Sequence, residues 1–362
     1  MGKLHDLAAL GQAVWFDFIQ RSLISSGDLQ DLIDQGVRGV TSNPTIFEKA
    51  IAGSHDYDDA LKRLAKAGKS VDEIYEELVL RDIMLTADLF LSVYVRTRGL
   101  DGYVSLEVNP ALAYDTDKTV QEAKRLFKTL GKPNVMIKVP ATDAGIQAVE
   151  ALIADGVNVN VTLLFSVNQY VKAAEAYLSG LEKYLATGGD IAKVASVASF
   201  FVSRVDTSVD AELERLGNRN LLGKAAIANA KIAYARFKEI FSGQRWERLA
   251  GKGAHVQRVL WASTGTKNPG YPDTLYVDKL IGPHTVNTLP PITLGAFLDH
   301  GHIASSLDSR LEQAEEEINE LMKLGVDLDV ITGKLEEDGV RLFSRSFESL
   351  LNSIKNKKNE VS

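Results

Sequence analysis

One lysine lies within the otherwise apolar run Val135–Pro140 (VMIKVP). Side chains alternate along a β-strand, so Lys138 faces away from the two valines and the isoleucine of this run. If those residues pack against outer helices, the lysine is buried, and desolvation lowers its pKa. An amine that is neutral part of the time attacks carbonyl groups and forms a Schiff base. The alternative is a lysine at a strand end whose ammonium reaches water, and this run alone does not decide between the two.

Polar residues also lie in or directly after most of the other β-rich runs. A single buried polar side chain is usually a structural hydrogen-bonding group. A polar residue near the end of nearly every strand instead indicates a shared site, because catalytic groups of parallel barrels come from the carboxyl ends of different strands. These residues are Asp17, Glu107, Asn160, Thr162, Ser199, Arg204 and Ser263. Asn43 precedes Pro44, which favours an extended Asn43 aimed over the strand ends, although plain turn chemistry is the better explanation of this pair taken alone.

Eight β-rich runs separated by helical stretches must position these groups. Eight parallel strands with helical crossovers close a (β/α)8 barrel, and an open doubly wound sheet is the alternative. The runs are Ala13–Phe18, Gly36–Ser42, Tyr103–Val108, Val135–Pro140, Val157–Leu164, Val194–Val202, Arg258–Ala262 and, with the weakest pattern, Leu275–Ile281.

Several helix boundaries are marked in the sequence. Ser70–Glu73 and Ser166–Gln169 have the spacing of capping boxes, and Thr142 can cap a helix that stops near Gly156. No Pro-, Gly- or Ser-rich linker divides the chain, so we expect residues 1–362 to form a single (β/α)8 barrel domain. Helix-rich stretches at about 44–100 and 303–354 exceed what a minimal barrel needs, and we interpret them as additions packed on it.

Composition excludes several classes of protein. The chain has 362 residues, 45% hydrophobic and 25% charged, with a net charge of −7. This is a globular profile, and the acidic surplus is unlike that of a dedicated nucleic-acid-binding protein. The absence of cysteine excludes disulfides, thiolate metal sites and a cysteine nucleophile. The first residues lack a long apolar segment, and no run of about 18 apolar residues occurs anywhere, so we expect a cytoplasmic protein without a membrane span.

Four segments in this order resemble the motifs of the transaldolase family. They are Ser42–Pro44 (SNP), Val135–Thr142 (VMIKVPAT), Gly156–Ser166 (GVNVNVTLLFS) and Ser199–Arg204 (SFFVSR). The resemblance covers the whole expected barrel, and the length is similar to that of the longer bacterial members. It implies a class I aldolase mechanism that moves a dihydroxyacetone unit between sugar phosphates in the pentose phosphate pathway, with no metal and no organic cofactor.

The resemblance also implies a role for each candidate residue. Lys138 is then the Schiff-base lysine and Asp17 the acid/base, while Glu107 and Thr162 hold a catalytic water. Asn43, Asn160 and Ser199 bind the dihydroxyacetone part, and Arg204 and Ser263 bind the phosphate. Members of the family often carry a second phosphate-binding arginine two residues after this serine. Here Gly265 takes that place, and Lys267 is the candidate replacement, as a point charge rather than a bidentate fork.

We therefore expect a transaldolase acting on sugar phosphates, with no nucleic-acid or membrane partner and with a homo-oligomer left open. One alternative is a fructose-6-phosphate aldolase, which releases dihydroxyacetone to water. Another is a sugar-phosphate-binding barrel without turnover. The combination of Asp17, Glu107 and Lys138 on three different strands argues against the second alternative, because a binding protein has no use for a buried amine.

Overall fold

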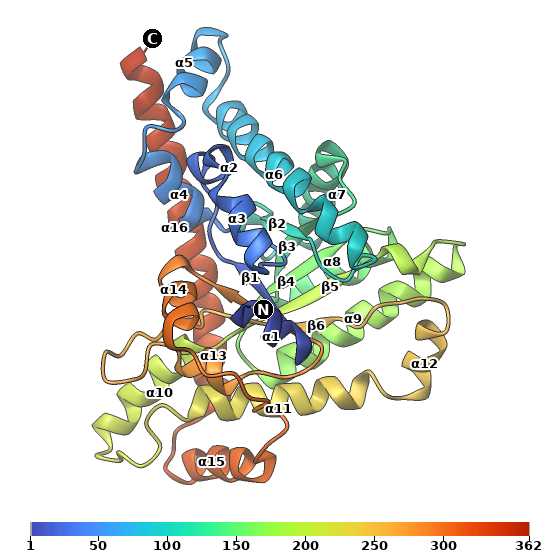
Figure 1. Cartoon of the computed structure of the whole chain (residues 1–362), viewed down its shortest axis with the longest axis vertical. Helices are drawn as coiled ribbons and strands as arrows, with labels where there is room; N and C mark the ends of the chain where they lie inside the picture. Colours follow the sequence, from blue (N-terminus) through green and yellow to red (C-terminus); the bar gives the residue numbers. More distant parts are fainter. Residues whose placement is uncertain (1, 362) are drawn as a thin grey trace.

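The computed structural model describes residues 2–361 as a parallel β-barrel surrounded by helices (Figure 1). Seven strands pair in parallel in the order β1-β7-β6-β5-β4-β3-β2. Their bounds are β1 (Gln12–Phe16), β2 (Val104–Glu107), β3 (Val135–Pro140), β4 (Val159–Leu164), β5 (Ser196–Phe201), β6 (Arg258–Ala262) and β7 (Thr285–Leu289). Every residue of these strands is buried, as expected for a parallel sheet covered on both faces.

The ring is closed by the segment expected as the second strand, Gly36–Ser42. Val40 bridges Phe16 of β1 on one side and Val104 of β2 on the other, both in parallel. Backbone bonds continue this pairing, since Val40 N–H donates to the Tyr103 carbonyl and Ser105 N–H donates to the Val40 carbonyl. The closed ring excludes the open doubly wound sheet. A Cβ on Gly39 would lie 2.7 Å from the Trp15 ring, so this close approach requires glycine.

The strand expected at Leu275–Ile281 is wrong. Residues Leu275–Lys279 form the short helix α13, and the strand of this region is β7, ten residues further on. Tertiary contacts decide the helix, because the Tyr276 hydroxyl donates to the buried carboxylate of Asp206 at 2.8 Å. The apolar and β-branched residues of Leu275–Ile281 reflect the burial of this segment rather than a strand conformation.

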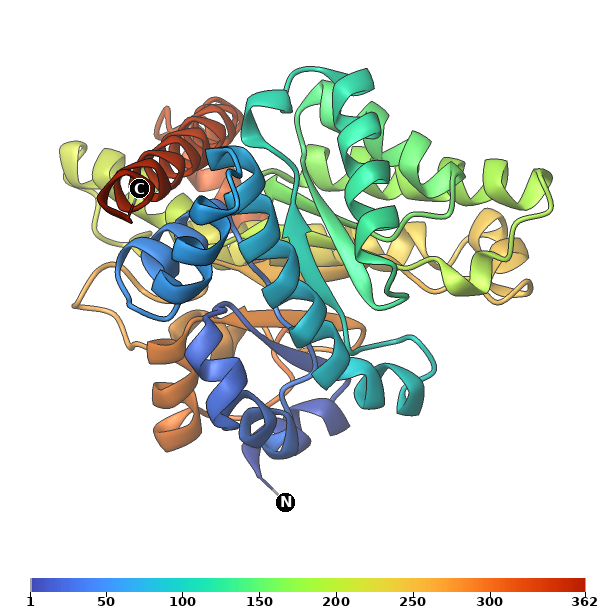
Figure 2. The same cartoon turned by 90° about the horizontal axis from the view of Figure 1, so that it is seen from above.

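Helices surround the barrel on its outside (Figure 2). Both expected capping boxes are present, at the starts of α6 and α9, and Thr142 caps α8 through the Gly145 N–H. The helices before the centre of the chain are α1 (Lys3–Ala9), α2 (Arg21–Ser26), α3 (Asp28–Gln35), α4 (Pro44–Ala52), α5 (Asp58–Lys66), α6 (Val71–Arg96), α7 (Thr116–Leu130) and α8 (Asp143–Ala154). Those after it are α9 (Val167–Ala186), α10 (Ser203–Arg215), α11 (Ala225–Ile240), α12 (Gln244–Ala250), α14 (Pro291–His300), α15 (Leu311–Lys323) and α16 (Leu328–Val361).

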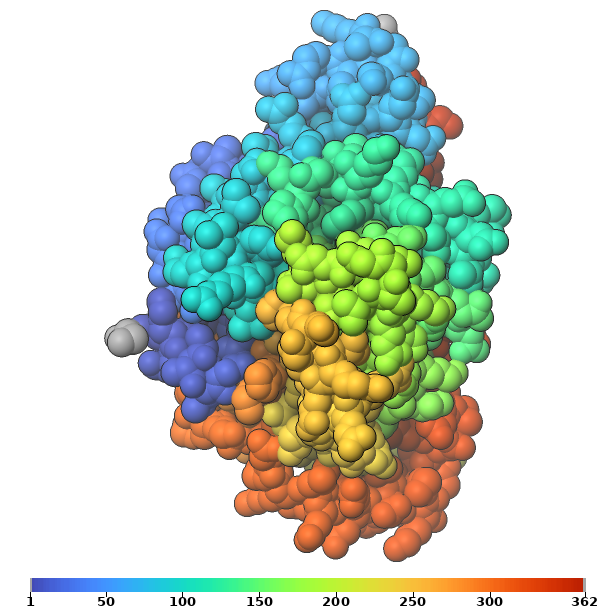
Figure 3. All heavy atoms as spheres, turned by 90° about the vertical axis from the view of Figure 1, so that its right-hand side faces the viewer, coloured from blue at the N-terminus to red at the C-terminus, as the bar shows by residue number. Residues whose placement is uncertain are grey.

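The additional helices bring distant parts of the chain together. The long α16 packs against α4, α5 and α6 and also reaches β4. Figure 3 shows the light-blue segment that holds α5 projecting at the end of the molecule where the last turns of α16 lie. Within residues 2–361, no helix is long and apolar enough to cross a membrane.

Candidate active site

A cavity of about 420 Å³ opens at the carboxyl ends of the strands. Its walls come from the strand ends, from the loops that follow them and from residues of four helices, α4, α10, α14 and α16. Most of the residues expected from the sequence line it: Asp17, Asn43, Lys138, Thr162, Ser199, Arg204, Ser263 and Lys267. Residues that lie up to 250 positions apart in the chain therefore share one chamber, as the barrel topology requires.

Lys138 is buried in β3 and faces the cavity. Its Nζ lies 3.3 Å from Glu107 Oε2 and donates a hydrogen bond of 3.0 Å to the Ser42 carbonyl. The two charged residues are direct neighbours in the pairing of β2 with β3. The alternative of a strand-end lysine extending to water is therefore wrong, since the ammonium group is enclosed by three segments of the barrel.

Glu107 and Asn160 lie behind the cavity wall rather than in it. Burial raises the pKa of the Glu107 carboxyl, and the Lys138 charge opposes that rise. Neither carboxylate oxygen of Glu107 accepts a hydrogen bond from any residue in the described range 2–361. Asn160 is fully buried beside Lys138 in the pairing of β3 with β4, and its amide connects Ser105 Oγ (3.1 Å) with the Ser199 hydroxyl (2.7 Å).

Asp17 directly follows β1 and contributes the acidic group of the cavity. Its carboxylate accepts a hydrogen bond of 2.6 Å from Thr41 Oγ1. Burial raises the pKa of Asp17, while the Thr41 hydrogen bond and the charges of Lys138 and Lys267 lower it. A carboxylate held in this balance has a higher affinity for a proton than an exposed aspartate, as a general base requires.

The position of Thr162 depends on an irregularity in β4. The register between β4 and β5 shifts between Val161 and Leu164, and Leu163 has a positive φ of 61°. Such bulges redirect side chains next to active sites. The Thr162 hydroxyl is buried, lines the cavity and has no hydrogen-bond partner in residues 2–361.

A group of basic side chains lies in the same cavity. Arg204, near the start of α10, is half-buried, and burial lowers the pKa of its guanidinium. Burial and the Arg204 charge lower the pKa of Lys267. The Ser263 hydroxyl lies 3.0 Å from that of Ser203 at the start of the same helix. This arrangement of cations and hydroxyl groups suits an anion such as a phosphate.

A steric contact favours glycine at position 265. A Cβ at this position would lie 2.8 Å from the Thr293 hydroxyl oxygen, so even an alanine requires the Thr293 side chain, α14 or the loop to shift. The loop that carries Lys267 therefore runs close to Thr293 of α14 at the position where the family resemblance expects an arginine. Positive charge in this loop comes from the lysine two residues further on.

Asn43 combines the two roles that the sequence left open. Its side-chain oxygen accepts the Ile46 N–H at 3.0 Å and so caps α4, which is turn chemistry, while the residue also lines the cavity.

Sequence reasoning missed Thr288, because its strand was not recognised, and Phe343, whose ring centroid lies 5.9 Å from Lys138 Nζ. No local signal marks Phe343, since it reaches the site only through the packing of α16.

A closed parallel barrel with its polar cavity at the carboxyl ends of the strands defines the class of (β/α)8-barrel enzymes. Residues 14–354 match the model of the family described as Transaldolase/Fructose-6-phosphate aldolase, and the chain belongs to this family. It is 47% identical over 368 residues to a transaldolase of Trichodesmium erythraeum, which covers 98% of this chain and 97% of the relative.

Further relatives show the same coverage. A transaldolase of Saccharopolyspora erythraea is 48% identical over 356 residues, covering 98% of this chain and 97% of its own. A transaldolase of Neisseria gonorrhoeae is 47% identical over 351 residues, covering 97% of this chain and 99% of its own. The chain is thus an enzyme of the transaldolase type. Within residues 2–361, no group of three or more His, Asp or Glu side chains is placed to hold a metal ion.

Proposed function

We propose that the enzyme transfers a dihydroxyacetone unit from a ketose phosphate, sedoheptulose 7-phosphate or fructose 6-phosphate, to an aldose phosphate, glyceraldehyde 3-phosphate or erythrose 4-phosphate. The observation that carries the proposal is the buried Lys138 amine, 3.3 Å from Glu107, in one cavity with Asp17 and a group of cations. An amine, a general base and an anion subsite are the parts that this transfer needs.

In this proposal the Lys138 amine attacks the C2 carbonyl of the ketose. The carbinolamine loses water and becomes an iminium ion, which draws electrons from the C3–C4 bond. Asp17 accepts the proton of the C4 hydroxyl as that bond breaks, and the shorter aldose phosphate leaves. The three-carbon enamine then attacks the aldehyde of the acceptor, Asp17 returns the proton, and hydrolysis of the new iminium frees the product.

Glu107 and Thr162 support the water steps in this proposal. Their buried oxygens have no hydrogen-bond partner in residues 2–361, so they can hold the water that the carbinolamine releases and that later adds to the iminium ion during hydrolysis. Asn43, Asn160 and Ser199 are assigned to the hydroxyl groups of the three-carbon unit. Arg204, Ser263 and Lys267 are assigned to the phosphate, with the two cations providing charge-assisted hydrogen bonds.

Borohydride trapping tests the covalent step. The protein is incubated with fructose 6-phosphate, reduced, and examined by intact mass and peptide mapping. A reduced three-carbon adduct on Lys138 is the expected result. The absence of an adduct, with binding of the sugar phosphate demonstrated, would contradict the mechanism and leave a non-catalytic sugar-phosphate-binding barrel.

Fructose-6-phosphate aldolase activity is the second candidate, because the description of the matched family includes it. The two activities differ in what happens to the three-carbon unit. A coupled assay without an acceptor measures free dihydroxyacetone, which the aldolase releases at every turnover and a transaldolase retains. A cytoplasmic location belongs to the same proposal and is tested by cell fractionation. The proposal does not depend on whether the enzyme is a monomer or a homo-oligomer, which light scattering measures.

A further inference from the structure

One wall of the active-site cavity belongs to α4, a helix that the sequence suggested was only an addition to the barrel. Thr45, Ile46 and Lys49 of this helix line the cavity. Their spacing of three and four residues places them on one face of the helix. Lys49 is the charged member of that face, and its side chain is exposed at the cavity.

Lys49 adds to an unbalanced positive charge. Among the residues that the structure describes, 2–361, Asp17 is the single acidic residue that lines the cavity, whereas Lys49, Arg204 and Lys267 line it together with Lys138. Within residues 2–361, Lys49, Arg204 and Lys267 form no ion pair, although ion pairs are frequent on the rest of the surface. The charge of Lys49 also contributes to the lowered pKa of Lys267, after burial and Arg204, so the two ammonium groups lie close enough to repel each other.

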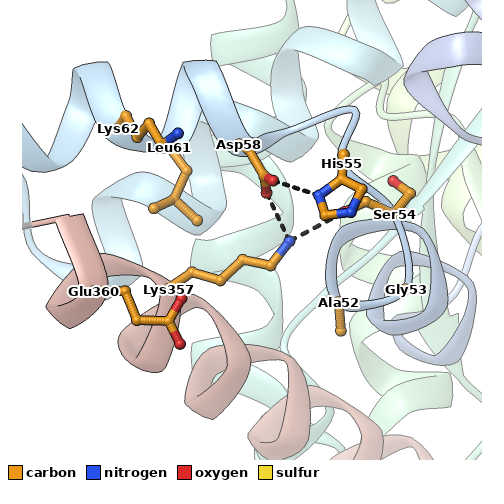
Figure 4. A pocket seen from close by; sticks show the side chains of 9 residues that line it. All are labelled: Ala52, Gly53, Ser54, His55, Asp58, Leu61, Lys62, Lys357 and Glu360. Carbon is orange, nitrogen blue, oxygen red and sulfur yellow. Dashed lines mark hydrogen bonds and ion pairs between the residues drawn. The ribbon is translucent and has the colours of Figure 1, made fainter.

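The helix that carries Lys49 is held in place at both ends. The Asn43 cap fixes its start, and Thr45 Oγ1 donates a hydrogen bond of 2.8 Å to Ser346 Oγ of α16. At the other end, Lys357 of α16 donates to the carbonyl of Ile51 in the last turn of α4 (3.0 Å). Lys357 also donates to the Ser54 carbonyl (3.1 Å) and pairs with Asp58 at 2.8 Å, both beyond the end of the helix (Figure 4). Lys49 is therefore presented from a braced helix rather than from a mobile loop.

We propose that Lys49 binds the phosphate of the substrate together with Arg204 and Lys267, as a third cation of the anion subsite. This inference rests on the proposed function and extends it to α4. A phosphate dianion relieves the repulsion among three unpaired cations, and charge-assisted contacts of this kind are among the stronger hydrogen bonds. The additional point charge also compensates for the bidentate arginine whose place Gly265 takes.

Imine trapping with two ketones tests the inference. Fructose 6-phosphate carries a phosphate, and dihydroxyacetone forms the same three-carbon imine without one. In Lys49→Met, the concentration of fructose 6-phosphate that gives half-maximal trapping on Lys138 should rise about tenfold, the loss expected for one charge-assisted contact. Half-maximal trapping by dihydroxyacetone should not change. Lys49→Arg keeps the charge and should keep most of the affinity for fructose 6-phosphate.

Lys66→Met is the matched control, because Lys66 is an exposed lysine of the neighbouring α5 that does not line the cavity. It should trap both ketones like the wild type. Unchanged trapping of fructose 6-phosphate by Lys49→Met would overturn this inference but not the proposed function. An equal loss with both ketones would overturn it too, since that shows a structural role. No trapping by the wild type with either ketone would instead remove the proposed function and, with it, this inference.

Discussion

Lys138 Nζ lies 3.3 Å from Glu107 Oε2, and both side chains are almost completely buried. Removing two charges from water is costly, and the attraction between them repays that cost only in part. A buried ion pair in which both carboxylate oxygens lack hydrogen bonds within residues 2–361 is therefore poorly suited to stabilising a fold. Its position at the cavity, which Lys138 lines, fits a catalytic use, and the following predictions test the residues around it.

Lys138→Arg should abolish turnover, because a guanidinium group keeps the positive charge next to Glu107 but cannot form an imine. We expect background activity in a coupled transfer assay and no borohydride adduct. A thermal melt of the variant serves as the folding control. Substantial turnover with an intact fold would contradict the Schiff-base mechanism.

Asp17→Asn should slow carbon–carbon cleavage by about 10²- to 10⁴-fold, the usual contribution of a general acid–base group. Dihydroxyacetone needs no cleavage, so its trapping on Lys138 should persist. Rapid-quench measurement of aldose release in a single turnover compares Asp17→Asn directly with the wild type. An unchanged cleavage rate would assign the acid/base role to another residue.

Thr41→Val should move the acid limb of the pH profile to higher pH. Burial already raises the pKa of Asp17, and the hydrogen bond from Thr41 opposes that rise. Loss of this bond disfavours the carboxylate, so activity that needs ionised Asp17 should appear at a higher pH than in the wild type. The measurement is kcat/KM across the acid range. A limb that stays in place, or moves to lower pH, would show that Asp17 does not produce it.

Lys267→Ala should raise KM more than it lowers kcat, because a cation that binds phosphate equally in the ground and transition states contributes uniform binding. Steady-state kinetics with fructose 6-phosphate at fixed acceptor concentration measure the split. Inorganic phosphate should also inhibit the variant less than the wild type. If neither KM nor phosphate inhibition changes, Lys267 is a solvated loop residue.

Glu336→Gln should stabilise the fold at pH 8 more than at pH 5. Burial and the charge of Asp143 raise the pKa of Glu336 to about 7, above that of the unfolded chain. Because the pKa of this carboxyl is higher in the folded state than in the unfolded chain, the folded protein loses stability as the pH rises from the unfolded pKa to the folded one. The neutral amide of glutamine does not ionise and avoids this loss.

Urea unfolding at the two pH values measures this difference. Glu337→Gln is the matched control, since Glu337 lies next to Glu336 in α16 and is exposed. It should change stability little at either pH. Equal effects of the two variants would assign the change to net charge rather than to the half-buried carboxyl of Glu336.

The sequence by itself determined most of the barrel and the types of residue in the site. β-rich runs separated by helical periodicity gave seven of the eight chain segments that form the ring, because alternation and capping are local properties. Lys138 could be singled out because burying a charged side chain in an apolar strand costs free energy, which makes such a residue a candidate for function. The family resemblance supplied roles for the surrounding residues, which the experiments above test.

Only the tertiary structure decided the features that depend on distant contacts. Residues 275–279 are helical because Tyr276 reaches Asp206, and the strand at 285–289 was missed for lack of a strong local pattern. The steric limit at Gly265 comes from α14, and the presence of Phe343 beside Lys138 comes from the path of α16. Lys49 belongs to the cavity for the same reason: packing between segments hundreds of residues apart, rather than local propensity, sets the direction of α4.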